Sequence, residues 1–182
     1  MVHTVQLVVV MDDISHIKFA KDNGAEEFKW ASTMEERNKL WQARHDAYFA
    51  GLQTRPGARA VSTDVCVPIS KLAECIAETE ADMRAATMPI HILGHVGDGN
   101  FHLIILIDPD SEAELHESHE INERLVNRAL RLEGTCTGEH GVGMGKMDFL
   151  VAEHGDAISV MRALKKTLDP DNIMNPGKIL RM

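Results

Sequence analysis

The segment 89–108 constrains the fold most, because two β-rich apolar runs flank the pair Asp98-Gly99. An Asp-Gly pair between such runs favours a tight two-residue turn, so this segment predicts a β-hairpin. With Asp98 and Gly99 at the centre of the turn, His95 lies directly opposite His102. Cross-strand neighbours share one face of a sheet, and two imidazoles at that spacing can reach the same metal ion.

Hydrophobic periodicity and capping signals predict the other elements. Strands are expected over residues 5–11 and 60–67. One helix is expected from the capping box Ser32-Thr33-Met34-Glu35 to about residue 50, and others over about 13–23, 70–86, 112–132, 146–154 and 157–168. Helices segregated from a mostly antiparallel sheet favour an α+β fold.

Composition bounds the organisation and the partners. The 182 residues, 44% of them apolar, can bury one core, so residues 1–182 are expected to form a single domain. The formal net charge of -9 disfavours nucleic acid as a partner. The sequence has no transmembrane-length apolar run, and Met1–Met11 lacks a signal-peptide pattern, so we expect an unexported chain. The three cysteines show no paired spacing and predict neither a disulfide framework nor a Cys-rich zinc site.

A loop of small residues, Gly134–Gly145, contains the pair Glu139-His140. Two imidazoles need a third ligand, usually a carboxylate, to hold a catalytic divalent metal ion, so Glu139 is the candidate third ligand. His140 is then left as a candidate general base. Spacing alone leaves the alternative open that the strand histidines are buried structural residues. Asp98 is interpreted as a turn residue, and a role in orienting a histidine is its alternative.

The glycines of this loop do not form a nucleotide-binding motif. His140 stands where a P-loop needs glycine, and Lys146 stands where the dinucleotide motif needs its last glycine. Lys146, at the start of a helix, is expected to be solvated.

Arg44 and Tyr48 lie one helical turn apart and form a candidate clamp for a substrate carboxylate. The alternative is that Arg44 is an ordinary surface residue of its helix.

Three separated segments, 94–102, 134–146 and 168–178, together resemble the C-terminal domain of FAD-linked oxidases of the vanillyl-alcohol oxidase type. Segments 40–48 and 62–68 are similar to D-lactate dehydrogenases (cytochrome) and to FAD-linked glycolate oxidase subunits. The resemblance implies a ferredoxin-like sheet with helices on one face, in a domain that caps the flavin. It also implies an FAD-binding domain outside this chain, either in cis or as a separate subunit.

The resemblance implies roles for the site residues. His95, His102 and Glu139 match the ligands of a divalent metal ion, zinc or manganese, which binds the hydroxyl and carboxylate of a D-2-hydroxy acid. His140 would take the hydroxyl proton while hydride passes to FAD. Arg44, with Tyr48, matches the arginine that binds the substrate carboxylate.

The same resemblance extends to substrate and partners. Asn175, in the tail 175–178, would lie near the flavin. Tyr48 and Ser62 stand where relatives acting on 2-hydroxyglutarate carry further polar residues, which favours D-lactate or glycolate. The electron acceptor would be cytochrome c or a quinone, and the location cytoplasmic, with peripheral attachment to the inner membrane as a variant. The isolated domain is expected to be inactive. The alternative function is a standalone metal- or small-acid-binding module without redox activity.

Overall fold

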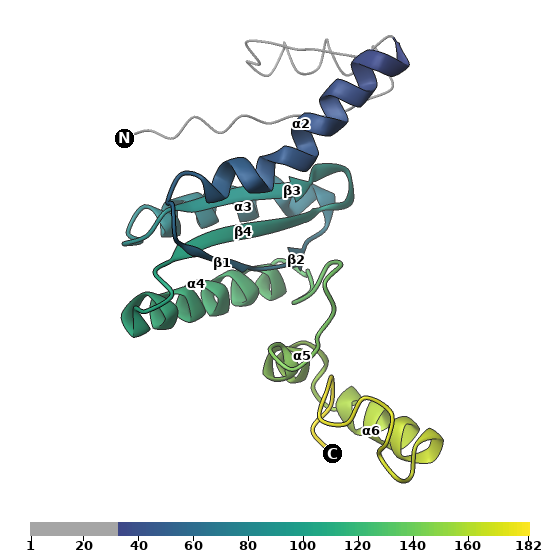
Figure 1. Cartoon of the computed structure of the whole chain (residues 1–182). Helices are drawn as coiled ribbons and strands as arrows, with labels where there is room; N and C mark the ends of the chain where they lie inside the picture. The colour runs from purple at the N-terminus through teal and green to yellow at the C-terminus, as the bar shows by residue number, and fades with distance from the viewer. Residues whose placement is uncertain (1–32) are drawn as a thin grey trace. The chain divides into compact units, whose positions relative to one another are not determined.

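The computed structural model describes residues 33–182, apart from the side chains of Arg44 and Val96 (Figure 1). The expected strand over residues 5–11 and the expected helix over 13–23 lie outside the described residues. The chain divides into two compact units, of which the first ends at Thr54 and the second begins at Arg55.

The first unit contributes helix α2 (Met34–Leu52). Its capping box pairs Thr33 with Glu36: the hydroxyl of Thr33 accepts the Glu36 N–H at 3.2 Å, and the Glu36 carboxylate accepts the Thr33 N–H at 3.0 Å. The expected pairing within Ser32–Glu35 was wrong by one residue, because the helix begins at Met34 and the third helical residue is therefore Glu36.

The second unit is built on an antiparallel sheet with β4 (Asn100–Ile107) at its centre. β3 (Ile90–His95) pairs with one edge of β4, and β1 (Arg59–Ser62) and β2 (Val65–Cys66) pair with the other.

The strand expected over residues 60–67 is interrupted at Thr63 and Asp64, between β1 and β2. The Thr63 N–H donates to the Leu103 carbonyl at 3.0 Å, and the Thr63 hydroxyl accepts the Leu103 N–H at 2.8 Å. Because the side chain takes the usual place of the carbonyl in the ladder, the Thr63 carbonyl is left to accept a hydrogen bond from a side chain.

β3 and β4 form the predicted hairpin, but their register differs from the prediction. His95 lies opposite Asn100, and His102 lies opposite Leu93. The pairing is displaced by two positions, so His95 and His102 are diagonal rather than direct neighbours. A displacement by an even number of residues preserves the face to which each side chain points, so both histidines still share a face.

The register was wrong because the turn is longer than two residues. Val96–Asp98 form a 3-10 turn and Gly99 extends the connection. Gly99 has φ +75°, and its carbonyl accepts the N–H of Val67 at 3.0 Å. This bond ties the turn to the chain after β2, a long-range contact that the Asp-Gly pair itself does not reveal. Asp98 lies in the turn, as expected.

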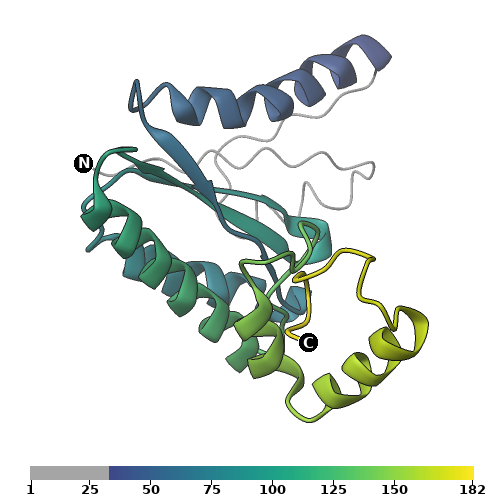
Figure 2. The ribbon, with the colours of Figure 1, turned by 60° about the horizontal axis from the view of Figure 1, so that its bottom comes forward.

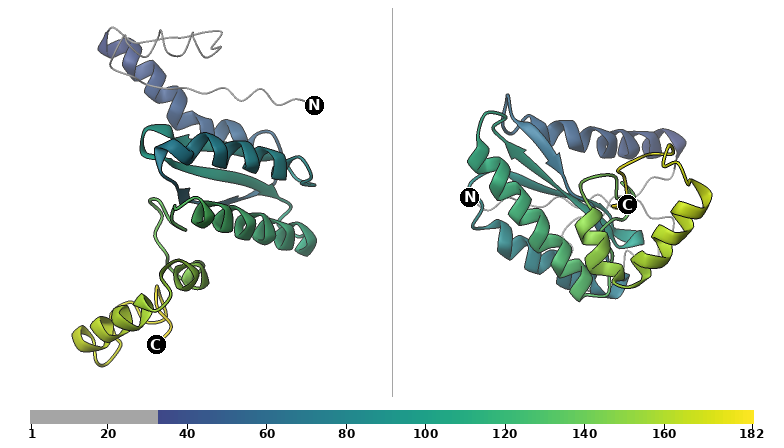
Figure 3. Two further views of the ribbon diagram at one scale, coloured as in Figure 1. Left: turned by 180° about the vertical axis from the view of Figure 1, so that it is seen from behind. Right: turned by 90° about the horizontal axis from the view of Figure 1, so that it is seen from below.

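Helices α3 (Ile69–Met83) and α4 (Glu112–Arg131) lie side by side along one face of the sheet (Figures 2 and 3). Alternate residues of β4 point to this face and form the hydrophobic core with the two helices. The core side chains include Phe101, Leu103, Ile105, Ile107, Leu72, Cys75, Ile121, Leu125, Val126 and Ala129. The predicted helices over 70–86 and 112–132 are confirmed, with each end within three residues of its predicted position.

Two further predicted helices are confirmed as α5 (Met147–His154) and α6 (Ala157–Leu168). After α4, Thr135 forms an isolated antiparallel bridge with Cys66 of β2. Strand, helix, hairpin, helix and this bridge follow the order of a ferredoxin-like domain, so the predicted α+β fold with helices on one face of the sheet is confirmed. Within residues 33–182, no helix combines the length and the apolar composition needed to cross a bilayer.

Candidate functional site

Three side chains from separate parts of the second unit meet beside the β3–β4 hairpin. His95 ends β3, His102 lies on β4, and Glu139 lies in the loop after α4. Oε1 of Glu139 is 3.3 Å from Nε2 of His95 and 3.0 Å from Nε2 of His102. One possible ligand atom from each residue lies within 4.8 Å of the other two. The structure therefore brings together the three predicted metal ligands.

The interruption between β1 and β2 orients His102. Its Nδ1 lies 3.0 Å from the Thr63 carbonyl, which accepts only from a protonated nitrogen, so Nδ1 carries the hydrogen. Burial lowers the pKa of His102, and the charge of His140 lowers it further, against the opposing effect of the Thr63 carbonyl. The neutral ring thus presents the lone pair of Nε2 toward Glu139, which is the state that a metal-ligating histidine needs.

Asp64 holds the loop that carries Glu139, although the sequence analysis did not single it out. Its side chain is 0% exposed. Oδ2 accepts the successive backbone N–H groups of Gly138, Glu139 and His140 at 2.9, 3.1 and 2.9 Å. The loop has no helix or strand of its own at these residues, and this one carboxylate accepts all three of their backbone N–H groups.

Asp64 remains ionised despite its burial. Burial by itself raises the pKa of this carboxyl, but hydrogen bonds from the His140 backbone, from Asn100 and from Thr137 outweigh it, and the pKa of Asp64 lies well below its ordinary value. The sequence carried one signal for this role, an acidic residue inside the Val-rich run 60–67.

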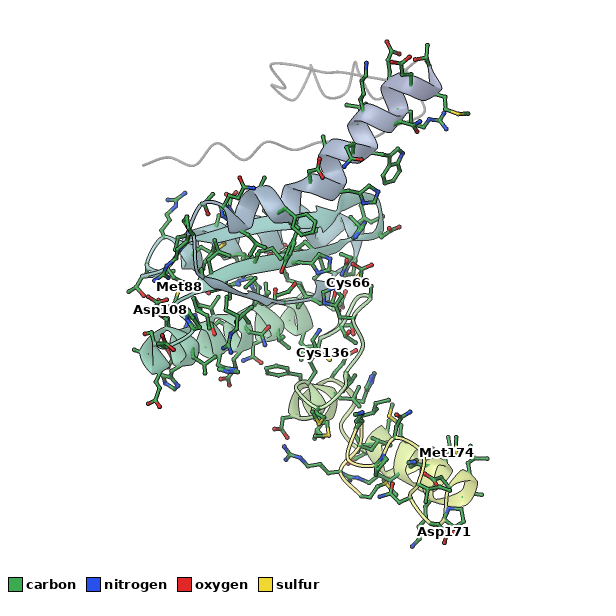
Figure 4. The ribbon with its side chains drawn as sticks, in the orientation of Figure 1. Cys66, Met88, Asp108, Cys136, Asp171 and Met174 are labelled. Atoms are coloured by element: carbon green, nitrogen blue, oxygen red, sulfur yellow. The ribbon has the colours of Figure 1, made fainter. Side chains whose placement is uncertain are left out.

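Lys146 also belongs to this framework, and the expectation that it is solvated was wrong. Its side chain is only 14% exposed, and its ammonium donates to the carbonyls of Asp64 and Cys136, each at 2.8 Å. A third contact, at 3.3 Å, reaches Oδ2 of Asp64. The three ammonium donors are therefore used in holding the loop against the strands. Cys66 and Cys136 mark this end of the sheet in Figure 4.

His140, the predicted general base, stacks on one of the predicted ligands. Its ring centroid is 4.7 Å from that of His102, with an angle of 5° between the planes. Its Nε2 lies 3.9 Å from Oε1 of Glu139, and its side chain is 44% exposed. The His140 ring therefore lies beside the three candidate ligands and is partly open to water.

The structure does not test the roles predicted for the remaining residues. The Arg44 side chain is outside the described residues. Tyr48 is an exposed residue of α2 whose ring meets Phe49 edge-on at 5.5 Å, and it belongs to the other unit. Asn175 is exposed in the loop after α6, next to Met174, which Figure 4 labels. The roles of Arg44, Tyr48 and Asn175 remain predictions.

The chemistry of the cluster fits a divalent cation. Two imidazole nitrogens and one carboxylate oxygen form a donor set suited to zinc or manganese, with coordination positions left for a small ligand. Asn100, the register partner of His95, has a buried Oδ1 with no hydrogen-bond partner among the described residues. A buried polar atom without a partner beside such a cluster is consistent with a site that a bound ligand or water completes.

Comparison with known proteins identifies a family and several relatives of the chain. A family model described as "FAD linked oxidases, C-terminal domain" matches residues 15–179. The chain is similar to the probable mitochondrial D-lactate dehydrogenase of Danio rerio, with 52% identity over 166 residues that span 91% of this chain and 33% of the relative. For the mitochondrial D-lactate dehydrogenase [cytochrome] of Arabidopsis thaliana the identity is 45%, spanning 88% and 28%. For the glycolate oxidase subunit GlcD of Bacillus subtilis (strain 168) it is 33%, spanning 87% and 34%. The chain thus spans about a third of the length of these relatives.

Proposed function

The chain belongs to the family of C-terminal domains of FAD-linked oxidases, and from this we propose that it forms the substrate- and metal-binding part of a flavin-dependent D-2-hydroxy acid dehydrogenase. The observation that carries the proposal is the convergence of His95, His102 and Glu139, whose donor atoms lie within 4.8 Å of one another. When bound, a divalent cation supplies Lewis acidity to a substrate hydroxyl, and FAD supplies the hydride acceptor.

Each residue of the cluster has a distinct task in this proposal. His95, His102 and Glu139 would hold zinc or manganese. His140 takes the substrate hydroxyl proton at its imidazole and passes it to water, because its ring is both next to the ligands and partly exposed. The hydrogen bond from His102 to Thr63 keeps the His102 ring from rotating away.

We assign the substrate carboxylate to Arg44 and Tyr48 on α2. A guanidinium offers a planar pair of donors to a carboxylate, and the phenol adds another. Ser62 donates to the Thr63 carbonyl at 3.4 Å and carries no charge, so nothing at this position supports a second substrate carboxylate. D-lactate or glycolate is therefore the proposed substrate class.

The remaining assignments concern the flavin, the electron acceptor and the location. FAD would be held mainly by an FAD-binding domain, in cis or as a separate subunit, with Asn175 at the contact. Cytochrome c or a quinone would accept the electrons. The relatives named above include mitochondrial proteins, so the cytoplasmic location remains a prediction.

Metal-dependent substrate binding tests the proposal on the chain itself. With manganese bound, the paramagnetic ion should shorten the transverse relaxation time of the D-lactate methyl protons, measured by NMR. The effect should be lost in His95→Ala/His102→Ala. The matched control His116→Ala/His119→Ala removes two exposed histidines of α4 and should retain it.

Two outcomes would contradict the proposal. One is a manganese-loaded chain that leaves D-lactate relaxation unchanged. The other is rapid oxidation of D-lactate by the FAD-free chain with a dye as acceptor, because the proposal leaves the isolated chain without a hydride acceptor. A metal-loaded chain that binds small acids without preference for 2-hydroxy acids would favour a standalone binding module instead.

A further inference from the structure

The Asp64 carboxylate is not one of the three candidate metal ligands, but it contacts the loop that carries one of them. It comes from the break between β1 and β2, and it is 0% exposed. The loop that it contacts is distant in the sequence, because Gly138 lies 74 positions after Asp64. Asp64 therefore connects the sheet to this loop.

The hydrogen bonds made by Asp64 fix the backbone of the two residues that carry the chemistry. The N–H groups of Glu139 and His140 donate to Oδ2 at 3.1 and 2.9 Å, and the Gly138 N–H and the Thr137 hydroxyl donate at 2.9 Å each. Successive N–H groups that converge on one anion hold the backbone in a single conformation. The directions in which the side chains of Glu139 and His140 leave the loop are thereby set.

A second grouping of possible ligands, Asp64 with His102 and His140, is also close enough to hold a cation. The hydrogen bonds argue against it. Oδ1 of Asp64 accepts the Asn100 amide at 2.8 Å, and Oδ2 accepts the backbone donors and Lys146. The Nδ1 of His102 that faces Asp64 at 3.6 Å is already bonded to a backbone carbonyl. A cation here would have to displace several hydrogen bonds, whereas Glu139 offers a carboxylate that is 51% exposed.

We propose that Asp64 is a positioning residue, which places the Glu139 carboxylate against His95 and His102 by holding the N–H groups of residues 138–140. This inference rests on the proposed function, because it assumes that His95, His102 and Glu139 bind a metal ion. Its content is separate: the geometry of the third ligand depends on a carboxylate that does not touch the metal ion.

The test measures the dissociation constant of manganese for the 182-residue chain by isothermal titration calorimetry. Asp64→Asn keeps the side-chain shape but replaces one acceptor oxygen by an NH2 group that faces N–H donors. Loss of a residue that orients a metal ligand weakens binding by about 10- to 100-fold, which is the effect expected here. The matched control is Asp169→Asn, since Asp169 is also buried and accepts the N–H groups of Ile173 and Met174, and its manganese affinity should be unchanged.

A double-mutant comparison separates positioning from general destabilisation. If Asp64 acts through Glu139, Asp64→Asn should weaken manganese binding by less than about threefold once Glu139→Ala has removed the ligand. An equal loss in both backgrounds would overturn the inference, and so would an unchanged affinity in Asp64→Asn alone. Absence of manganese binding to the unmodified chain would overturn the proposed function, and this inference with it.

Circular dichroism establishes whether Asp64→Asn folds. If it does not, Thr137→Val carries the test, because it removes one donor to Asp64 and leaves the carboxylate in place. We expect manganese binding about threefold weaker in this variant. An affinity equal to that of the unmodified chain would overturn the proposal.

Discussion

Gly138→Ala is the substitution whose effect the structure fixes most directly. A Cβ at this position would lie 1.9 Å from Nδ2 and 2.7 Å from Cγ of Asn100. Ordinary contacts are near 3.5 Å, so Asn100 would have to move by about 1.5 Å. Its amide donates to Oδ1 of Asp64 at 2.8 Å and to the Val65 carbonyl at 2.9 Å, and such a movement breaks both bonds.

The magnitude follows from these contacts. Gly138 itself is exposed, but the Asn100 side chain that must move is buried. Overpacking against a buried side chain costs about 1–3 kcal/mol, and each lost hydrogen bond costs about 1 kcal/mol. With partial relaxation of the loop, Gly138→Ala should lower the free energy of unfolding by about 3 kcal/mol. Gly145→Ala is the matched control in the same loop, because a Cβ there meets nothing within 4 Å and Gly145 is not in the left-handed region. It should change the free energy of unfolding by less than about 0.5 kcal/mol.

Urea unfolding followed by far-ultraviolet circular dichroism measures both variants against the unmodified chain at pH 7. A Gly138→Ala variant as stable as the unmodified chain would refute the close approach of Gly138 to Asn100. Equal losses in the two variants would refute the distinction between a packed and an open glycine.

Three further predictions concern the core, an ion pair and a thiol. Leu125→Ala in the fully buried core should lower the free energy of unfolding by about 3 kcal/mol. Leu164, on α6, is 59% exposed, so Leu164→Ala should change it by less than about 0.5 kcal/mol. Equal losses in urea unfolding would contradict this placement of the core. Burial raises the pKa of Asp82, but hydrogen bonds from Arg124 and Arg128 outweigh it and the pKa is lowered, so the stabilisation is present above about pH 4 and is lost as the pH falls through the folded-state value. Asp82→Asn should therefore cost roughly 1 kcal/mol at pH 7 and progressively less below pH 4, and a cost independent of pH would contradict the ion pair. Burial, with a hydrogen bond to Glu153, raises the pKa of Cys136 to about 12. This thiol should therefore resist Ellman's reagent at pH 8 in the folded chain and react after unfolding in urea. Rapid labelling of Cys136 in the folded chain would contradict this prediction.

Local sequence signals predicted an element well where the residues that determine it lie within that element and next to its ends. α4 begins after Ser111, whose hydroxyl accepts the Glu114 N–H at 3.2 Å, and it buries Ile121 and Leu125, which lie one turn apart on one face. The hairpin register failed because the length of its turn depends on the contact between Gly99 and Val67, which lie far apart in the sequence.

The candidate site was predictable to a similar extent. His95 and His102 could be placed on one face because strand alternation survives a register error of two residues. Glu139 was identified from its residue type beside two histidines. Asp64 could not be identified as the anchor of the loop, because its role depends on N–H groups that only the folded chain brings to it. Lys146 was misjudged for the same reason, since its partners are backbone carbonyls from two separate segments.

The metal content of the chain tests the central claim most directly. The untagged chain, purified without chelators and supplied with zinc or manganese, is compared with His95→Ala/His102→Ala by inductively coupled plasma mass spectrometry. The convergence of His95, His102 and Glu139 predicts about one metal ion per unmodified chain and essentially none in the variant. Equal metal content in the two proteins, or no metal in the unmodified chain, would contradict the account.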